Sequence, residues 1–167
     1  MMMIVSVPPK ELSDAGVIAK SVNLGSIRLR SAHVDDANYE LFLDPNDTSE
    51  ITLNIDYKSE MKELIEGKSL TSFVKVEAKL LKKEAFIRYM VQYQVDYTLP
   101  SVPFPENLSR EMFNAFARHN GLLNSWPYIR SQISNLSNDA GFPVMLPLLK
   151  ITAQKDEAIN SEVVKTN

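Results

Sequence analysis

The residues that could carry catalysis are few and scattered in this sequence. The two histidines, His33 and His119, lie far apart, and the chain has no cysteine to complete a metal site with either of them. Asp35 and Asp36 are adjacent carboxylates, and such neighbours rarely converge on one substrate. The chain has no glycine-rich phosphate loop, dinucleotide fingerprint or nucleophile elbow. The sequence therefore predicts a protein that is not an enzyme and needs no cofactor.

Two further patterns suggest ligand chemistry but have simpler interpretations. The segment 44–49 carries several oxygen ligands, yet Ser49 stands where a calcium loop requires glycine, so we expect a turn and no metal site. Tyr89, Tyr93 and Tyr97 recur at every fourth residue on one face of segment 87–97 and could form a ligand platform. A stripe of this kind is more often core, because tyrosine buries its ring and finds a partner for its hydroxyl.

Composition limits the class of protein further. The chain has 167 residues, which suits one domain, and its net charge of -3 argues against nucleic acid as the main partner. Residues 1–9 are apolar, but they lack a basic start and end in two prolines, which is a poor signal peptide. No stretch approaches the roughly 20 apolar residues that a membrane-spanning helix needs. We expect a cytoplasmic protein without membrane insertion.

Four segments alternate between apolar and polar residues as strands do. The first, from about residue 17 to 30, changes phase at Gly25, which predicts a bulge. The second is 51–57, the third 70–80 and the fourth 87–97, with a tight connection at 82–84. Between the first two strands lies a long polar crossover, 33–50, and after the second we expect a helical turn at 59–67. An antiparallel sheet with one wet face is predicted.

A long amphipathic helix follows the strands. Apolar residues recur at three- and four-residue spacing from Leu108 to Leu136, with Pro127 expected to kink the helix and Gly141 to cap it. Segment 144–151 is expected to be extended. The predicted fold is α+β: a four-stranded antiparallel sheet covered on one face by this helix. We expect a flexible arm at 1–16, one domain at 17–151, and a polar tail or weak second helix at 152–167.

The segment 126–143, WPYIRSQISNLSNDAGFP, closely resembles the helix of the SecB family of export chaperones. The family shows an aromatic-Pro-Tyr-x-Arg stretch, an isoleucine and a final Phe-Pro, and Leu146-Pro147 is similar to the link that leads to its second helix. The resemblance implies a homotetramer, built as a dimer of dimers with the helices between outer sheets. It also implies binding of unfolded polypeptides along a hydrophobic groove, without cofactor or catalysis.

Two departures from the family bear on the partners. Export members dock a translocase motor through acidic residues on the outer face of the first strand, where this sequence has Ser26 and Arg30 with Arg28 between them. This reversed charge predicts weak docking of the motor. The tail 152–167 also lacks the bulky apolar residues of the family's second helix. Some SecB-like relatives instead protect the antitoxin of a toxin–antitoxin pair, and an adaptor without general client binding is a further alternative.

The crossover and the proline-rich connection are the best candidates for client binding, because promiscuous surfaces use apolar residues on adaptable segments. The alternative for the crossover is a loop that packs its own small cluster. The predicted client-binding residues are Tyr39, Leu41, Phe42, Leu43, Phe142, Val144, Met145 and Leu146. The predicted oligomer-interface residues are Phe113, Phe116, Leu123, Trp126 and Tyr128.

Overall fold

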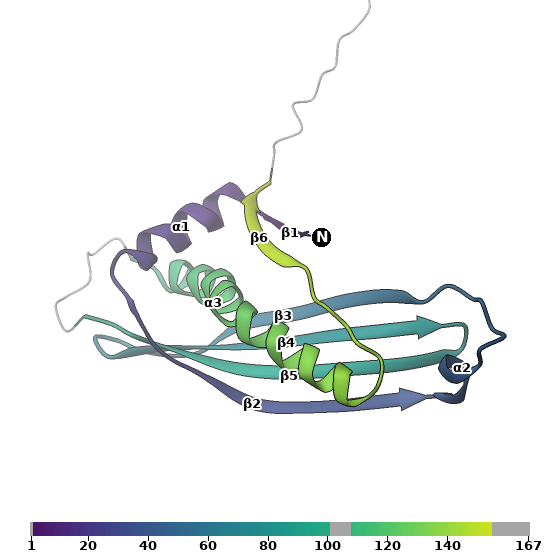
Figure 1. Cartoon of the computed structure of the whole chain (residues 1–167). Coiled ribbons are helices and arrows are strands. Elements are labelled where there is room, and N and C mark those ends of the chain that lie inside the picture. Colours follow the sequence, from purple (N-terminus) through teal and green to yellow (C-terminus); the bar gives the residue numbers. More distant parts are fainter. Residues whose placement is uncertain (1, 101–107, 155–167) are drawn as a thin grey trace, which may run out of the picture.

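A four-stranded antiparallel sheet forms the base of the molecule, and one long helix crosses it (Figure 1). The computed structural model describes residues 2–100 and 108–154. The strands lie in the order β2-β5-β4-β3 and the helix is α3 (Arg110–Asp139). This is the predicted α+β fold. The strands are β2 (Asn23–Ala37), β3 (Thr52–Ile65), β4 (Ser69–Lys82) and β5 (Ala85–Thr98).

The two central strands bury the face that their alternation predicts. On β5 the side chains from Ile87 to Tyr97 that share the odd positions are all buried, and β4 contributes Leu70, Val74 and Val76. Their polar positions form the opposite, wet face. The β4–β5 hairpin turns at Lys83, whose φ of 53° lies in the left-handed region. The tight connection at 82–84 is confirmed.

The edge strand β2 is irregular at Gly25, where the sequence predicted a bulge. Its register against β5 shifts between Leu24 and Ser26, and again between Leu29 and Ser31. A Cβ on Gly25 would lie 3.1 Å from the Asp96 carbonyl oxygen, so the backbone comes close to β5 at this position. The predicted bulge is confirmed. The strand continues to Ala37, so the crossover is shorter than expected.

The helical turn expected at 59–67 is wrong, because β3 runs unbroken to Ile65. Met61, Leu64 and Ile65 have the spacing of a helix face in the sequence. In the structure β3 has a bulge between Met61 and Glu63, where it contains one residue more than the paired strand β4. This bulge turns Leu64 towards the core opposite Leu70, so a strand reproduces the pattern of a helix.

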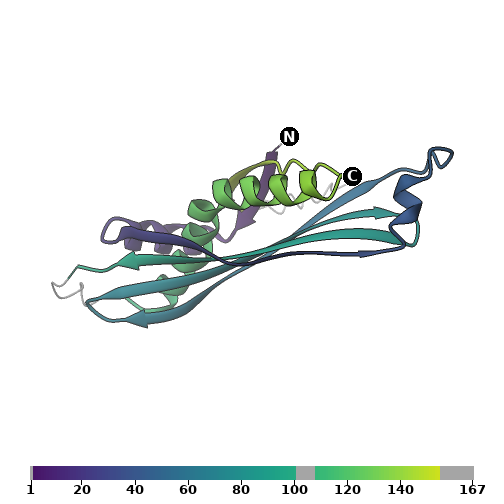
Figure 2. The same cartoon turned by 60° about the horizontal axis from the view of Figure 1, so that its bottom comes forward.

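Helix α3 has the predicted ends and passes through Pro127 unbroken. Ser109 caps its start by accepting a hydrogen bond from the Met112 N–H. At its end Gly141 has a φ of 81°, and the Phe142 N–H donates to the Ser137 carbonyl, which is a Schellman motif. Pro127 removes the donor that would bond one turn back. Figure 2 shows the two halves of α3 running in different directions, as a kink requires.

The first residues of the chain are ordered where a flexible arm was expected. They form β1 (Met2–Val7) and α1 (Pro9–Ala19), and β1 pairs in parallel with β6 (Leu148–Ala153) (Figure 1). The prolines at 8 and 9 start the helix, since the first helical position needs no N–H donor. Helix α1 packs on α3. Together β1, α1 and β6 form a layer on the side of α3 that faces away from the sheet. The expected tail or second helix lies mostly at 155–167, outside the described residues.

Candidate functional site

The crossover and the connection, about 100 positions apart in sequence, meet around the ring of Phe142. The crossover here is 38–51, with the short helix α2 (Glu40–Leu43), and the connection is 140–147. The Phe142 ring packs edge-on against Tyr39 and against Phe42, with centroids 5.3 Å apart in both pairs. The Tyr39 hydroxyl donates to the Ala140 carbonyl at 3.2 Å. We call Tyr39, Phe42 and Phe142 the aromatic cluster. It joins two segments that were predicted separately.

Buried charge fixes the crossover to the β4–β5 hairpin. Lys82 is only 3% exposed and its Nζ donates to the Leu41 carbonyl at 2.8 Å. The Asp47 carboxylate lies 3.5 Å from this Nζ and 3.2 Å from that of Lys83. Asp47 also accepts hydrogen bonds from the Ser49 side chain and backbone, which lower its pKa well below the usual range, although burial opposes them. The crossover is therefore held in one position by a charged anchor.

The connection is fastened along α3 by hydrogen bonds to its backbone. Ser137 is fully buried and its Oγ accepts from the Val144 N–H at 2.8 Å. The Arg130 Nε donates to the Leu146 carbonyl, and the Trp126 Nε1 donates to the Pro147 carbonyl, both at 2.9 Å. An irregular segment beside the core needs such partners for its backbone groups. These contacts give the connection a defined path.

The predicted client-binding residues divide into a buried and an exposed set. Phe42, Val144 and Leu146 are buried, while Tyr39, Leu41 and Phe142 are half-buried. Leu43 is 60% exposed and Met145 is 77% exposed. The buried set packs the loops onto the core, as the self-packing alternative expects. The exposed set is the part that an approaching chain can touch without rearrangement.

The predicted oligomer-interface residues also divide. Phe113, Phe116 and Trp126 are buried within the chain itself, and Phe116 packs on Tyr97 with ring centroids 4.8 Å apart. Leu123 and Tyr128 are 45% and 52% exposed. Only these two are available to a partner in the described conformation.

Sequence reasoning missed an exposed apolar strip on β2. Leu24, Leu29 and Val34 lie opposite Tyr97, Tyr93 and Tyr89 of β5, and so face the same side as the core. Each is more than a third exposed, because α3 crosses the sheet diagonally and leaves this edge uncovered (Figure 1). Their alternation marked a strand in the sequence. No signal there showed that the helix would leave them bare.

The tyrosines of β5 are core, as interpreted. Tyr89 donates to the Phe142 carbonyl at 3.2 Å, Tyr93 donates to the Tyr128 carbonyl at 3.3 Å, and Tyr97 accepts from Asn124 at 3.0 Å. Burial raises the pKa of all three hydroxyls. Tyrosines satisfied in this way support the helix and the connection, and they offer no ligand platform.

The remaining candidates for chemistry stay apart. His119 is buried against Glu11 of α1, whereas His33 is exposed on the outer face of the sheet. Asp35 pairs with Arg88. Within residues 2–100 and 108–154, no three His, Cys, Asp or Glu residues come together as metal ligands. No helix there is long and apolar enough to cross a membrane.

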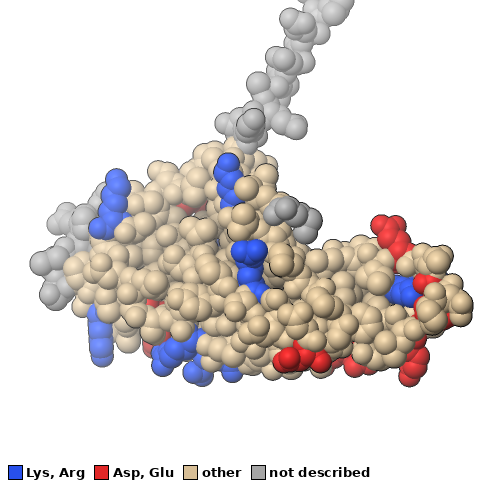
Figure 3. All heavy atoms as spheres, viewed as in Figure 1, with Lys and Arg blue, Asp and Glu red and all other residues tan. Residues whose placement is uncertain are grey.

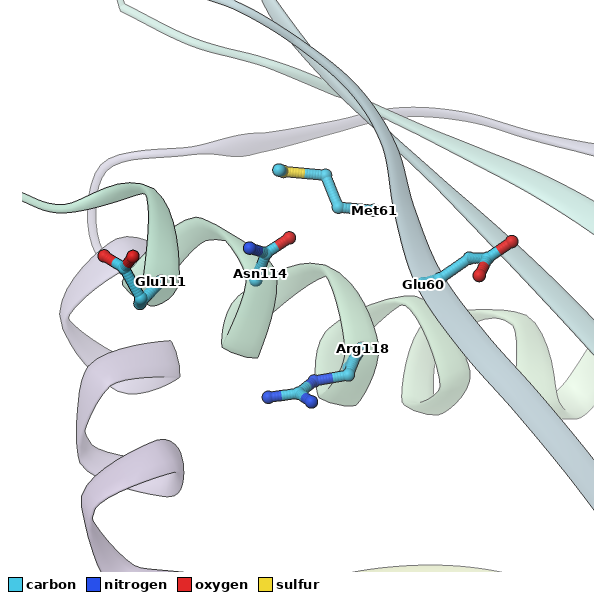
Figure 4. Close-up of a pocket in the computed structure, with 5 residues that line it drawn as sticks. All are labelled: Glu60, Met61, Glu111, Asn114 and Arg118. Carbon is cyan, nitrogen blue, oxygen red and sulfur yellow. The ribbon is translucent and has the colours of Figure 1, made fainter.

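A hollow of about 250 Å³ between β3 and α3 gathers mixed charges (Figure 4). It is lined by Glu60, Met61, Glu111, Asn114 and Arg118. Arg118 points towards α1, where it pairs with Glu11 at 2.9 Å. The two carboxylates that line the hollow come from different elements, Glu60 from β3 and Glu111 from the first turn of α3. The arrangement ties α1 to α3 and carries no nucleophile with a base beside it.

On the face of the molecule drawn in Figure 3, acidic and basic side chains are unevenly distributed. Figure 3 shows acidic side chains gathered at the end where α2 lies and basic ones towards the opposite end. The exposed acids of the crossover and the β4–β5 turn are Glu40, Asp44, Glu50 and Glu84. The aromatic cluster therefore lies at the acidic end.

Comparison with solved structures identifies the architecture. The Mycobacterium tuberculosis Rv1957 SecB-like chaperone, solved in complex with a ChAD peptide from the Rv1956 HigA1 antitoxin, superposes with a TM-score of 0.69 at 13% identity. The match covers 84% of this chain and 99% of that one. The chain has a SecB-like fold. A protein of unknown function from Streptococcus agalactiae matches with a TM-score of 0.41 at 13% identity, over 76% of this chain and 97% of that one.

Comparison of sequences finds no relative, in contrast to the comparison of folds. No protein-family model matches the chain. No curated protein matches it either. The positions compared with the motor-docking acids, Ser26 and Arg30, both lie on β2. Ser26 and the intervening Arg28 bind Asp96 of β5, at 2.9 and 2.6 Å.

Proposed function

We propose that this protein is a SecB-like molecular chaperone that binds non-native polypeptides and keeps them from aggregating or folding. It works by binding alone, without cofactor or catalytic step. The observation that carries the proposal is the meeting of the crossover and the connection at Phe142, together with the exposure of Leu43 in the crossover and of Met145 in the connection. Exposed leucine and methionine on loop segments suit clients of varied sequence.

The acidic end of the molecule supports a preference among clients. Extended segments that carry both apolar and basic residues would match the exposed apolar side chains and the surrounding carboxylates. Electrostatic attraction of this kind speeds encounter and weakens as salt is added. The proposed client is thus an unfolded, apolar and net-positive stretch of polypeptide.

A dedicated antitoxin chaperone is the second candidate. The structure of similar fold was solved with an antitoxin peptide bound, and here the first-strand positions compared with motor-docking acids are neutral or basic. Both observations favour a single protected partner over coupling to an export motor. A general chaperone should act on unrelated clients, whereas a dedicated one should protect one protein and few others.

Self-association into a dimer or tetramer belongs to the same proposal. The edge of β2 is open among the described residues, and Leu24, Leu29 and Val34 expose apolar surface beside it. Tyr128 and Leu123 of α3 add further exposed apolar area. Open strand edges and exposed apolar strips are commonly covered by a partner chain. Sedimentation equilibrium tests this: a monomer at micromolar concentration would overturn it.

The function is tested by suppression of aggregation. A chemically unfolded model protein is diluted into buffer with and without the chaperone, and light scattering is followed at near-stoichiometric ratio without nucleotide. Leu43→Asp combined with Met145→Asp should lose most of the suppression, because charge opposes apolar client contacts. Ile65→Asp is the matched control, since Ile65 is 40% exposed at the other end of β3. Phe42→Asp is a poorer choice because Phe42 is buried.

Three outcomes separate the candidates. Suppression by the wild type that falls only in the Leu43/Met145 variant supports a general chaperone at this surface. Equal suppression by both variants removes the surface from the proposal. A wild type that suppresses nothing overturns general activity, and capture of one partner from the native cell then favours the dedicated role over an adaptor.

A further inference from the structure

The crossover spans the end of the sheet with more chain than the distance requires. Ala37, just before it, pairs with Phe86 of β5. Thr52, just after it, pairs with Leu81 of β4, and Leu81 pairs with Phe86. The two ends therefore lie in one row, three strand spacings or about 15 Å apart. The 14 residues between them can extend to about 45 Å, so the crossover can lift from the sheet without breaking a strand pair.

The backbone of the crossover is bonded to itself. The N–H groups of Leu41 and Phe42 donate to the carbonyls of Asn38 and Tyr39. Among the described residues, no hydrogen bond between backbone groups joins 38–51 to another element. Asn38, with a φ of 53°, turns the chain out of β2 in a left-handed conformation that asparagine tolerates. The crossover can therefore move as one body, which Figure 1 shows with α2 at the end of the sheet.

Side chains hold the crossover down, and buried charge is prominent among them. Lys82 lies on the same side of β4 as the buried Val76 and Ala78, and the crossover supplies partners for its amine, the Leu41 carbonyl and the Asp47 carboxylate. The Lys82 and Asp47 side chains are 4% and 8% exposed, and the Asp47 Oδ2 accepts no hydrogen bond from the described residues. Burying two charges costs nearly as much as their attraction returns, and both regain water when the crossover lifts. Such a pair suits a contact that opens.

Lifting the crossover uncovers the aromatic cluster, because Phe42 is 8% exposed and packs on the Phe142 ring. We infer that the crossover is a lid, latched by Lys82 and Asp47, which opens over the end of the sheet. Clients then bind the uncovered Phe142 ring, so the latch sets how readily the protein accepts a client. The client step rests on the proposed function, whereas the opening of the lid does not.

A single thiol measures the opening, because the chain has no cysteine of its own. In Phe42→Cys the thiol lies on the buried side of the lid and reacts with a bulky maleimide when the lid lifts. Lys82→Met keeps the length of the side chain without its charge. It should raise the labelling rate about tenfold or more, since the closed state then buries Asp47 without its Lys82 partner. Lys75→Met, exposed on the outer face of the same strand, is the matched control and should change the rate by less than about twofold.

A second thiol separates opening of the lid from unfolding of the sheet. Val74→Cys is fully buried on β4, so it reacts when the sheet itself unfolds. It should label at least about 100-fold more slowly than Phe42→Cys, and its rate should rise steeply with urea. Labelling of Phe42→Cys should change little with urea below the unfolding transition, because lifting the lid exposes little surface. Equal rates at the two thiols, or no effect of Lys82→Met at Phe42→Cys, would overturn the lid.

Association with a permanently unfolded model protein, its cysteines reduced and alkylated, tests the client step. If the lid controls access, Lys82→Met should speed association about tenfold, in proportion to the open fraction, and Lys75→Met should associate at the wild-type rate. A merely structural role for Lys82 would leave association unchanged or slow it. Faster labelling of Phe42→Cys with unchanged association would overturn the client step. A wild type that binds no client would contradict the proposed function, while the labelling rates would still decide whether the lid opens.

Discussion

Gly121 of α3 and Ser72 of β4 are in such close contact that no side chain fits between them. A Cβ on Gly121 would lie 2.3 Å from the Ser72 Oγ and 3.0 Å from its Cβ. The same Ser72 hydroxyl donates to the Ala117 carbonyl at 2.8 Å, although it is fully buried. The missing side chain lets α3 approach the sheet, and the hydroxyl bonds the helix where it crosses β4.

Gly121→Ala should destabilise the protein by about 1–3 kcal/mol, because overpacking outweighs the higher helix propensity of alanine. Urea unfolding measures the change. Gly16→Ala is the control, since its Cβ meets open space, and it should be neutral or stabilising by up to about 1 kcal/mol. In a Ser72→Ala background the cost of Gly121→Ala should be smaller. An equal cost in both backgrounds would show that the contact with Ser72 is not its cause.

Asp47 should make the crossover sensitive to acid. Its pKa is lowered by the hydrogen bonds of Ser49 and by Lys83, so the folded state binds a proton more weakly than the unfolded state. Its stabilising contribution is complete above about pH 4, the ordinary carboxyl range, and is lost as the pH falls further. The difference in unfolding free energy between wild type and Asp47→Asn should therefore shrink from pH 4 to pH 2. Exposed Asp36→Asn serves as the control, and a constant Asp47 difference would contradict the assignment.

Ser137→Ala should cost about 1–3 kcal/mol, because the buried Val144 N–H loses its acceptor. Urea unfolding again measures the loss, with fluorescence of Trp126 reporting on the connection that it contacts through Pro147. Ser131→Ala on the same helix is exposed and should change stability by less than about 0.5 kcal/mol. Similar losses in both variants would mean that the Ser137–Val144 bond contributes nothing particular.

Glu11→Gln should loosen α1 without unfolding the sheet. The Glu11 carboxylate contacts Arg118 at 2.9 Å and His119 at 3.0 Å, and it is one third exposed, so we expect a global change of less than about 1 kcal/mol. Hydrogen exchange should accelerate in α1 while β4 and β5 stay protected. Glu66→Gln, exposed in the β3–β4 turn, is the control. Acceleration spread over the sheet would contradict a local role.

Much of the fold can be predicted from local sequence patterns, and the predictions that were wrong have identifiable causes. The burial of β5 and the end of α3 at Gly141 could be predicted, because alternation and the glycine cap are encoded within a few residues. The bulge near Met61 restores the core phase with one extra residue, and sequence periodicity cannot distinguish this from a helical turn. Strand β1 depends on pairing with β6, nearly the whole chain away, so nothing near residues 2–7 indicates it.

The candidate site shows the same division. The crossover and the connection could be chosen from their apolar residues, but their contact through Phe142 could not, because it depends on how α3 crosses the sheet. The exposed strip on β2 was missed for the same reason. Exposure is set by the path of the covering helix, and periodicity records only which side of a strand is apolar.

The pairing of β1 with β6 constrains the order in which the chain can fold during synthesis. Met2 pairs with Leu148, so during synthesis β1 has to wait until β6 has left the ribosome. At about 5–20 residues per second, the interval is on the order of 10–30 seconds. For that time the apolar strand β1 has no partner to pair with. The layer of β1, α1 and β6 therefore forms last, after the sheet and α3 have formed.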